Sequence, residues 1–563
     1  MIKWFVFFYF VLSSTCVAEE IYQTRYWLNL LYYEKSGDRY QSLADDDSFF
    51  VAGTSAKTDP KLEYEASVKL ANRQDPGFRT KFPLRYKFIA RFNAFPYLPL
   101  VTPNEDIVSA MVVFPNRYMA NPASMFGHIF FILKSRHGLM DSEILHYLAD
   151  TSGTDEYAYV FNGLTGRFKG RFLSEPYFKK IKEYNFVEDR EIIYYDLKLT
   201  PDQIENLQLH GLELRQTYFD YYFLDENCAF FTGKLLNVIL TEDILTRSPL
   251  VFPSQIINTL IEKSLLTNEY RRKPSTKEFN ENFHRLNAEG QSEVVDLILK
   301  PTENVRCGEE VLKTFLYISE HLINTQSQLA DTIRQNRIQA YKRLSAEART
   351  EIRPANVKQT YVLPIRSKGV SVAYGLPNQC SFSYRPIYYG EFDSFGDQEI
   401  KKMNCLAPRL ILQPTRPPLV EITLADLVIL TQHNVVLGTY SWRLKSALAY
   451  RQSLLADQSI ELGQAYPFLD GLTFGFLGFN LASYDPIIDR ELNALIFRPS
   501  LSLGVETPLY SDTSSASIGY DYRFGKNYLM AKISLKALDL VHQLSYVRTE
   551  DFDGWRLSAT SIF

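Results

Sequence analysis

SASIGYDYRFGKNYLMAKISLKAL, the stretch from Ser515 to Leu538, alternates between apolar and polar residues. Successive side chains of an extended chain point to opposite faces, so this alternation predicts a strand with one apolar face. The apolar set is Ala516, Ile518, Tyr520, Tyr522 and Phe524, and the opposite set is Ser517, Gly519, Asp521 and Arg523. Gly525, Lys526 and Asn527 then turn the chain into a second strand, which predicts a β-hairpin.

The same alternation recurs through residues 358–563. YSWRLKSALAYR (Tyr440–Arg451) shows it, and WRLSATSIF (Trp555–Phe563) ends the chain on an aromatic residue. Tyr- and Phe-rich strands of this kind are typical of outer-membrane barrels, and the segment has room for about 10 to 14 of them. A soluble β-sandwich is the alternative. The prolines of QPTRPPLVEITLADL (Gln413–Leu427) count against regular strands there.

The N-terminus, MIKWFVFFYFVLSSTCVAEE, has the pattern of a secretory signal peptide. Lys3 supplies the positive start, Trp4 to Leu12 the apolar core, and Cys16 to Ala18 a small-residue cleavage site. We therefore expect an exported, periplasm-facing protein that is associated with the outer membrane.

The chain of 563 residues is too long for one domain. The expected organisation is multidomain α+β: signal peptide 1–18, helical N-terminal cap 19–106, mixed α/β unit 107–265, helical spacer 266–357 and antiparallel β domain 358–563. In the α/β unit, strands are expected in DIVSAMVVFP, GHIFFILKS, SEILHYLAD and EIIYYDLKL, and a loop in GLTGRFKGRF. Thr200, Pro201 and Gln203 predict a capped helix start.

Composition excludes several classes of function. A net charge of −4 without a basic run argues against nucleic acid as a partner. The sequence has no H-E-x-x-H or C-x-x-C motif and no phosphate-binding glycine loop, so we expect no metal and no cofactor.

Cys228 lies in YYFLDENCAFFTGKLL (Tyr221–Leu236), where a polar turn leads into an apolar helix. A free thiol has a pKa of about 8.5, and a helix N-terminus or a neighbouring imidazole favours its reactive thiolate. Pairing of Cys228 with Cys307, and of Cys380 with Cys405, is the alternative use of the four cysteines expected in the mature chain.

His128 is the candidate base, because it begins an apolar strand in NPASMFGHIFFIL (Asn121–Leu133). The alternative is a structural histidine that bonds the backbone. A base also requires an orienting partner. His146 and Asp150, four residues apart on the next expected strand, are the two candidates.

NPASMFGHIFF and YYFLDENCAFF, whose His128 and Cys228 are 100 positions apart, resemble the signature segments of the Lnb N-terminal periplasmic domain family. That family is named for bacterial lipoprotein N-acyltransferases. The resemblance covers residues 107–265 and implies a permuted papain-like α/β fold in which Cys228 is the nucleophile, His128 the base and Asn227 a substrate-binding residue. His146 or Asp150 would be the third member.

The implied activity is that of an envelope cysteine acyltransferase. Cys228 would take an acyl chain from a phospholipid donor as a thioester and pass it to an amine such as a lipoprotein N-terminus. One alternative is a papain-like amidase or peptidase acting on peptidoglycan. The other is a non-catalytic outer-membrane scaffold.

Overall fold

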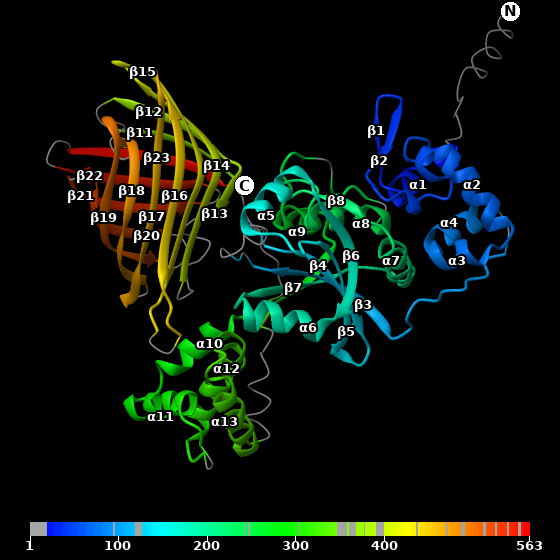
Figure 1. Ribbon diagram of the computed structural model, residues 1–563, viewed down its shortest axis with the longest axis horizontal. Helices are drawn as coiled ribbons and strands as arrows, with labels where there is room; N and C mark the ends of the chain where they lie inside the picture. The colour runs from blue at the N-terminus through cyan, green and yellow to red at the C-terminus, as the bar shows by residue number, and fades with distance from the viewer. Residues whose placement is uncertain are drawn as a thin grey trace, which may run out of the picture. The chain divides into compact units, whose positions relative to one another are not determined.

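The computed structural model forms two compact units, Met1–Pro364 and Ile365–Phe563 (Figure 1). The described residues are 20–93, 96–116, 118, 127–240, 242–245, 248–302, 305–345, 357–359, 368–375, 378–389, 399–434, 437–468, 471–485, 490–510, 514–523, 526–537, 540–549 and 553–562. The predicted signal peptide, the turn residues Phe524 and Gly525 and the terminal Phe563 lie outside them.

The first unit begins with the expected helical cap, to which the structure adds a short hairpin. Its helices and strands are α1 (Arg25–Leu30), β1 (Tyr33–Ser36), β2 (Arg39–Ser42), α2 (Pro60–Asn72), α3 (Pro76–Lys81) and α4 (Pro83–Asn93). The fully buried Arg85 pairs with Glu63 at 2.7 Å, and its backbone N–H donates to Glu213 at 2.8 Å. Because an isolated buried charge is costly, this network fixes the cap against the following domain.

An eight-stranded antiparallel sheet in the order β10-β9-β7-β3-β4-β5-β6-β8 follows. Its strands are β3 (Ile107–Pro115), β4 (Phe130–Ser135), β5 (Gly138–Ala149), β6 (Phe168–Pro176), β7 (Ile192–Leu197), β8 (Phe219–Tyr221), β9 (Leu266–Arg272) and β10 (Val357–Gln359). The prediction of a loop at GLTGRFKGRF was wrong. That stretch ends α5 (Glu156–Thr165) and then pairs as β6 with β5 and β8.

Helices cover both faces of the sheet. On one face, α6 (Tyr177–Ile181) and the π-helical turn η5 (Lys182–Val187) pack on Ile132 and Ile144. On the other face lie α7 (Pro201–Leu214) and α8 (Cys228–Leu240), where the ring of Phe231 packs against that of Tyr147 with the ring centres 4.5 Å apart. Thr200 and Gln203 form the predicted capping box of α7.

The remaining helices of the first unit are α9 (Pro253–Glu262), α10 (Ser275–Phe283), α11 (Ala288–Leu299), α12 (Glu309–Thr325) and α13 (Ala330–Arg343). They give the predicted spacer its helical character, although the spacer also contributes β9 and β10 to the sheet. Among the described residues, no helix is long and apolar enough to span a membrane.

The second unit is a closed antiparallel barrel. Its strands are β11 (Gly369–Gly375), β12 (Gln379–Arg385), β13 (Ile387–Tyr389), β14 (Glu399–Gln413), β15 (Arg416–Thr431), β16 (Ser441–Tyr450), β17 (Leu454–Phe468), β18 (Gly471–Asp485), β19 (Arg490–Tyr510), β20 (Ser514–Arg523), β21 (Lys526–Ala537), β22 (Leu540–Arg548) and β23 (Asp553–Ile562). Among these described strands β13 is an appendage on β14, and the other twelve close through pairing of β12 with β14.

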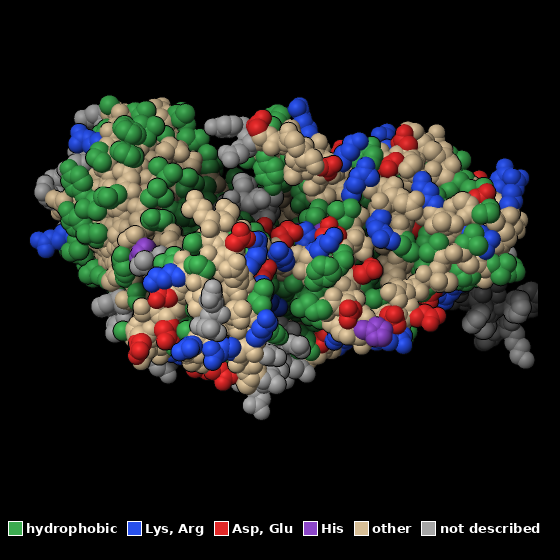
Figure 2. Space-filling view, turned by 60° about the horizontal axis from the view of Figure 1, so that its bottom comes forward, with side chains coloured by type: hydrophobic (Ala, Val, Ile, Leu, Met, Phe, Trp, Pro, Cys, Tyr) green, Lys and Arg blue, Asp and Glu red, His purple; other side chains and the backbone are tan. Residues whose placement is uncertain are grey.

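The barrel faces follow the predicted alternation. Ile518, Tyr520 and Tyr522 are exposed, whereas Asp521 and Arg523 are buried inside. Figure 2 shows hydrophobic side chains gathered over the visible outer surface of the barrel. The prolines that counted against strands are accommodated, because Pro417 and Pro418 open β15 beside a register shift between Ile411 and Gln413. An apolar outer face around a closed barrel is the arrangement of an outer-membrane protein.

Candidate active site

Cys228 is the first residue of α8, and Asn227 caps that helix. The side-chain oxygen of Asn227 accepts from the N–H groups of Ala229 at 2.9 Å and Phe230 at 3.3 Å. Its amide nitrogen donates to the carbonyls of Phe223 at 3.1 Å and Val251 at 2.8 Å. All these bonds are internal and Asn227 is buried, so its side chain fixes the start of α8 at Cys228; the prediction that Asn227 binds substrate stays a prediction.

Three groups donate hydrogen bonds to the Cys228 sulfur. They are the backbone N–H of Ile129, the backbone N–H of Ala229 and the hydroxyl of Tyr221. Ile129 directly follows His128, so the Ile129 contact joins the strand that carries the histidine to the mouth of the helix that carries the thiol. The two motifs, far apart in the sequence, meet at this point.

His128 is buried at the entry to β4. Its backbone N–H donates to the Pro115 carbonyl at 3.3 Å, and its ring lies 6.1 Å from the ring of Tyr184. The preceding Gly127 has φ +85°, and a Cβ there would lie 2.4 Å from a ring carbon of Phe114. The sequence therefore needs glycine before the histidine, because any other residue would displace Phe114.

Burial makes both groups neutral at rest. It raises the pKa of the Cys228 thiol to about 11, although the three hydrogen bonds and the nearby Arg190 guanidinium act in the opposite direction. Burial also lowers the pKa of His128 well below its ordinary value, and the adjacent His146 and Arg190 add to this effect. Both shifts oppose transfer of the thiol proton to the imidazole in the resting protein, so a role of His128 as a general base is a matter for experiment.

The two predicted third members are placed differently. His146 lies on β5 with its ring 6.4 Å from that of His128, and burial lowers its pKa to about 3. Asp150 lies beyond the end of β5, where it is exposed and accepts from the Ser152 hydroxyl at 2.7 Å. The expectation that both residues share one strand face was therefore wrong, because the strand ends at Ala149.

Most ring nitrogens of the two histidines at this site make no hydrogen bond to the described residues. Neither nitrogen of His146, nor Nε2 of His128, has a hydrogen-bond partner among the described residues. His146 is thus a neighbour of His128 without a direct bond to it. Nε2 of His128 likewise makes no hydrogen bond to the Cys228 sulfur.

Sequence reasoning missed four residues that enclose the site: Tyr184, Arg190, Tyr221 and Lys180. Arg190 is buried and donates to the carbonyls of Pro115 at 3.0 Å and Asn116 at 2.6 Å. Pro115 also receives the His128 N–H, so Arg190 holds the strand end on which the histidine is placed. No local motif marks these residues, because their approach depends on strand pairing.

The alternative use of the cysteines as disulfides is not observed. Cys228, Cys307, Cys380 and Cys405 are all free. Within the described part of the chain, no group of three or more His, Cys, Asp and Glu side chains is arranged to hold a metal ion.

Barrel and buried cysteine site together define an envelope protein with an outer-membrane anchor and a periplasm-facing α/β domain. Residues 102–263 match the family model of the Lnb N-terminal periplasmic domain, which confirms the resemblance that the two motifs indicated. Residues 19–92 match a domain of unknown function, DUF7843.

Other comparisons add little. No curated protein matches the sequence. The solved structures that are similar include a KdgM porin and a KdgM porin in complex with disordered oligogalacturonate. Each has 10% sequence identity and a TM-score of 0.24, and each match covers 35% of this chain and 98% of the porin.

Proposed function

We propose that this protein is an envelope cysteine acyltransferase. Cys228 takes an acyl chain from a phospholipid, and the acyl chain then passes to an amine such as a lipoprotein N-terminus. The observation that carries the proposal is the hydrogen bond from the Ile129 N–H to the Cys228 sulfur, which brings the His128 strand to the start of α8.

In the first half-reaction, the Cys228 sulfur attacks the ester carbonyl carbon while Nε2 of His128 accepts the thiol proton. The dipole of α8, which begins at Cys228, favours the negative charge that forms on the carbonyl oxygen. The ester C–O bond then breaks, and His128 returns the proton to the departing lysophospholipid oxygen. The product is an acyl thioester on Cys228.

In the second half-reaction, the acceptor amine attacks the thioester carbonyl. Its nitrogen loses a proton to His128 as the new C–N bond forms, and the C–S bond breaks. His128 then reprotonates the departing thiolate, which restores the resting pair. The acyl chain ends in an amide on the acceptor.

Aromatic rings around the site support an apolar substrate. Tyr184 and Phe130 lie within 6.1 Å of the His128 ring, and Tyr221 contacts the thiol. Such rings suit an acyl chain better than the polar backbone of peptidoglycan. His128 is kept neutral by burial, so its unprotonated state does not depend on a charge carried by the substrate.

The test is intact-protein mass spectrometry of the full chain in detergent after incubation with a phospholipid. Wild type should gain one acyl mass that neutral hydroxylamine removes, and Cys228→Ser should not. Cys307→Ser is the matched control, because Cys307 is a half-buried free thiol elsewhere in the unit.

Three results would contradict the proposal. An equal adduct in Cys228→Ser would exclude the thioester at this residue. Cleavage of peptidoglycan fragments without any acyl adduct would favour the amidase, and the absence of both activities would favour the scaffold.

A further inference from the structure

Helix α5 presents an apolar face to solvent beside the candidate active site. Its exposed residues Val160, Phe161 and Leu164 follow the i, i+1, i+4 spacing of one helix face. Phe161 is 54% exposed and Leu164 is 52% exposed. Apolar side chains that gather on one face of a soluble domain mark a surface that binds something.

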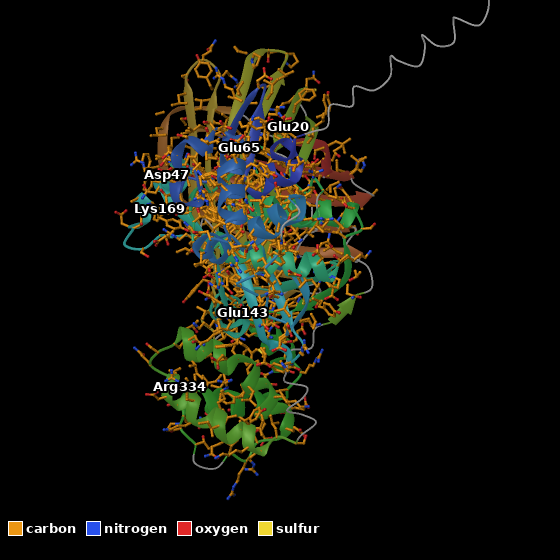
Figure 3. All side chains as sticks on the ribbon, turned by 90° about the vertical axis from the view of Figure 1, so that its right-hand side faces the viewer. Glu20, Asp47, Glu65, Glu143, Lys169 and Arg334 are labelled. Carbon is orange, nitrogen blue, oxygen red and sulfur yellow. The ribbon has the colours of Figure 1, made fainter. Side chains whose placement is uncertain are left out.

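A basic side chain borders this face, and two more follow it on β6. Arg167 lies with its guanidinium carbon 4.9 Å from the centre of the Phe161 ring. Lys169 and Arg171 lie over the ring of Tyr218, at 4.3 and 5.6 Å from its centre. Figure 3 shows Lys169 at the outer edge of the view. Among the side chains that the structure describes, no ion pair engages these three residues, although Lys169 is in register with Asp220 on β8.

The inner side of α5 leads directly to the thiol. Gly163 lies against the Phe223 ring, where a Cβ would come within 2.2 Å, and the tilted ring of Tyr159 packs on the same ring with its centre 5.2 Å away. The Phe223 ring lies 6.2 Å from that of Tyr221, whose hydroxyl bonds the Cys228 sulfur. Only two aromatic side chains therefore separate the exposed helix from the nucleophile.

We propose that the exposed face of α5, with Arg167, Lys169 and Arg171, docks the α/β domain on a phospholipid surface that contains anionic headgroups. Apolar residues on a helix with a basic border are the pattern of interfacial membrane helices. The barrel already associates the chain with a membrane, which provides a phospholipid surface. Delivery of a lipid to Cys228 from this face rests on the proposed acyl transfer, whereas docking itself does not.

The test places the photocrosslinker p-benzoylphenylalanine at position 161 of the full chain in proteoliposomes. Position 338 on α13 is the matched control, because Ile338 is 56% exposed in the same unit. Irradiation should attach phospholipid at position 161 and far less at position 338. Equal labelling at the two positions, or attachment of position 161 to protein instead of lipid, would overturn the proposal.

Charge is tested in the same system with Arg167→Glu and Lys169→Glu. Each reversal should lower lipid attachment at position 161 by about fivefold at low ionic strength in vesicles with anionic lipid. Arg39→Glu, at an exposed position on β2, should have no effect. Unchanged attachment in both patch variants would exclude an anionic surface as the ligand.

Repeating the crosslinking in Cys228→Ser separates the two proposals. Lipid attachment at position 161 should persist there, because docking does not need the thiol. A thioester without lipid attachment at position 161 would remove the docking surface alone. Lipid attachment without a thioester in wild type would remove the acyl transfer alone.

Discussion

At the scale of residues, burial keeps both Cys228 and His128 uncharged in the resting protein. Burial holds the thiol pKa near 11 and keeps the imidazole neutral. A neutral pair does not form a reactive thiolate until a substrate carbonyl is in place, which limits side reactions such as oxidation. The hydrogen bonds from Ile129, Ala229 and Tyr221 then favour the anion as it develops.

The two buried histidines predict a pH dependence of stability. The unfolded chain binds protons on His128 and His146 near the ordinary value of 6.5, whereas the folded chain keeps both neutral to lower pH. The unfolded state therefore binds more protons below 6.5, and the stability of the α/β domain should fall as pH decreases through that value.

Hydrogen exchange of the β4 and β5 amides measures this effect. Protection should decrease below pH 6.5, and His146→Gln should weaken the decrease because one titrating group is lost. His137→Gln, at an exposed residue, should leave the pH dependence unchanged. Protection that is independent of pH in wild type would contradict the buried neutral pair.

Sequence alone indicated Cys228 and His128 as the candidate nucleophile and base because each lies in a short motif with a local cause. Cys228 follows a helix cap, and His128 follows Gly127, a position at which no other residue fits. Arg190 and Tyr221 could not be predicted, since their contacts depend on which strands pair. Asp150 was predicted as an orienting partner because it lies four residues after His146, but β5 ends at Ala149, before it reaches Asp150.

At the scale of elements, the step from β3 to β4 places the histidine. Pro115 ends β3 and accepts the His128 N–H, while Gly127 fits its backbone against Phe114. The strands themselves were predictable from their apolar runs. β6 was not, because its glycines read as loop residues, whereas the Gly170 backbone lies against the Tyr147 ring with no room for a Cβ.

Gly127→Ala should damage the site in two ways. Alanine at φ +85° costs about 1 to 2 kcal/mol of backbone strain, and its Cβ would overlap Phe114. We expect thioester formation to fall at least about tenfold, because misplacement of a catalytic group by about 1 Å is costly.

Gly153→Ala is the matched control for this substitution. Gly153 has φ +72°, but a Cβ there would meet no atom within 4 Å. It carries the backbone strain alone and should leave thioester formation near the wild-type level. Equal activity of Gly127→Ala and Gly153→Ala would show that the contact with Phe114 does not position His128.

At the scale of the whole molecule, side chains bridge the lumen of the barrel, beside a cavity of about 720 Å³ that charged residues line. Lys402 on β14 pairs with Glu506 on β19, five strands away around the ring, at 2.6 Å. Arg523 reaches Glu461 at 3.5 Å, three strands away. Apolar clusters lie inside as well, one around Ile400 and Phe476 and another around Ile411 and Tyr484. An open porin has a polar, water-filled lumen instead.

The bridged lumen predicts a low ion conductance. Full-length protein in a planar bilayer should show no steady open channel, whereas Lys402→Ala combined with Glu506→Ala should raise the conductance by removing a cross-lumen pair. Lys526→Ala, at the end of β21, is the control. Large stable channels from wild type would contradict an occupied lumen.

The most direct test of the central claim is the rate of thioester formation on Cys228 in His128→Gln. A general base contributes about 10²- to 10⁴-fold to such a step, so the single-turnover rate should fall by at least 10²-fold while His137→Gln keeps the wild-type rate. A wild-type rate in His128→Gln would show that the histidine does not accept the proton of the thiol, and the account of this site would fail.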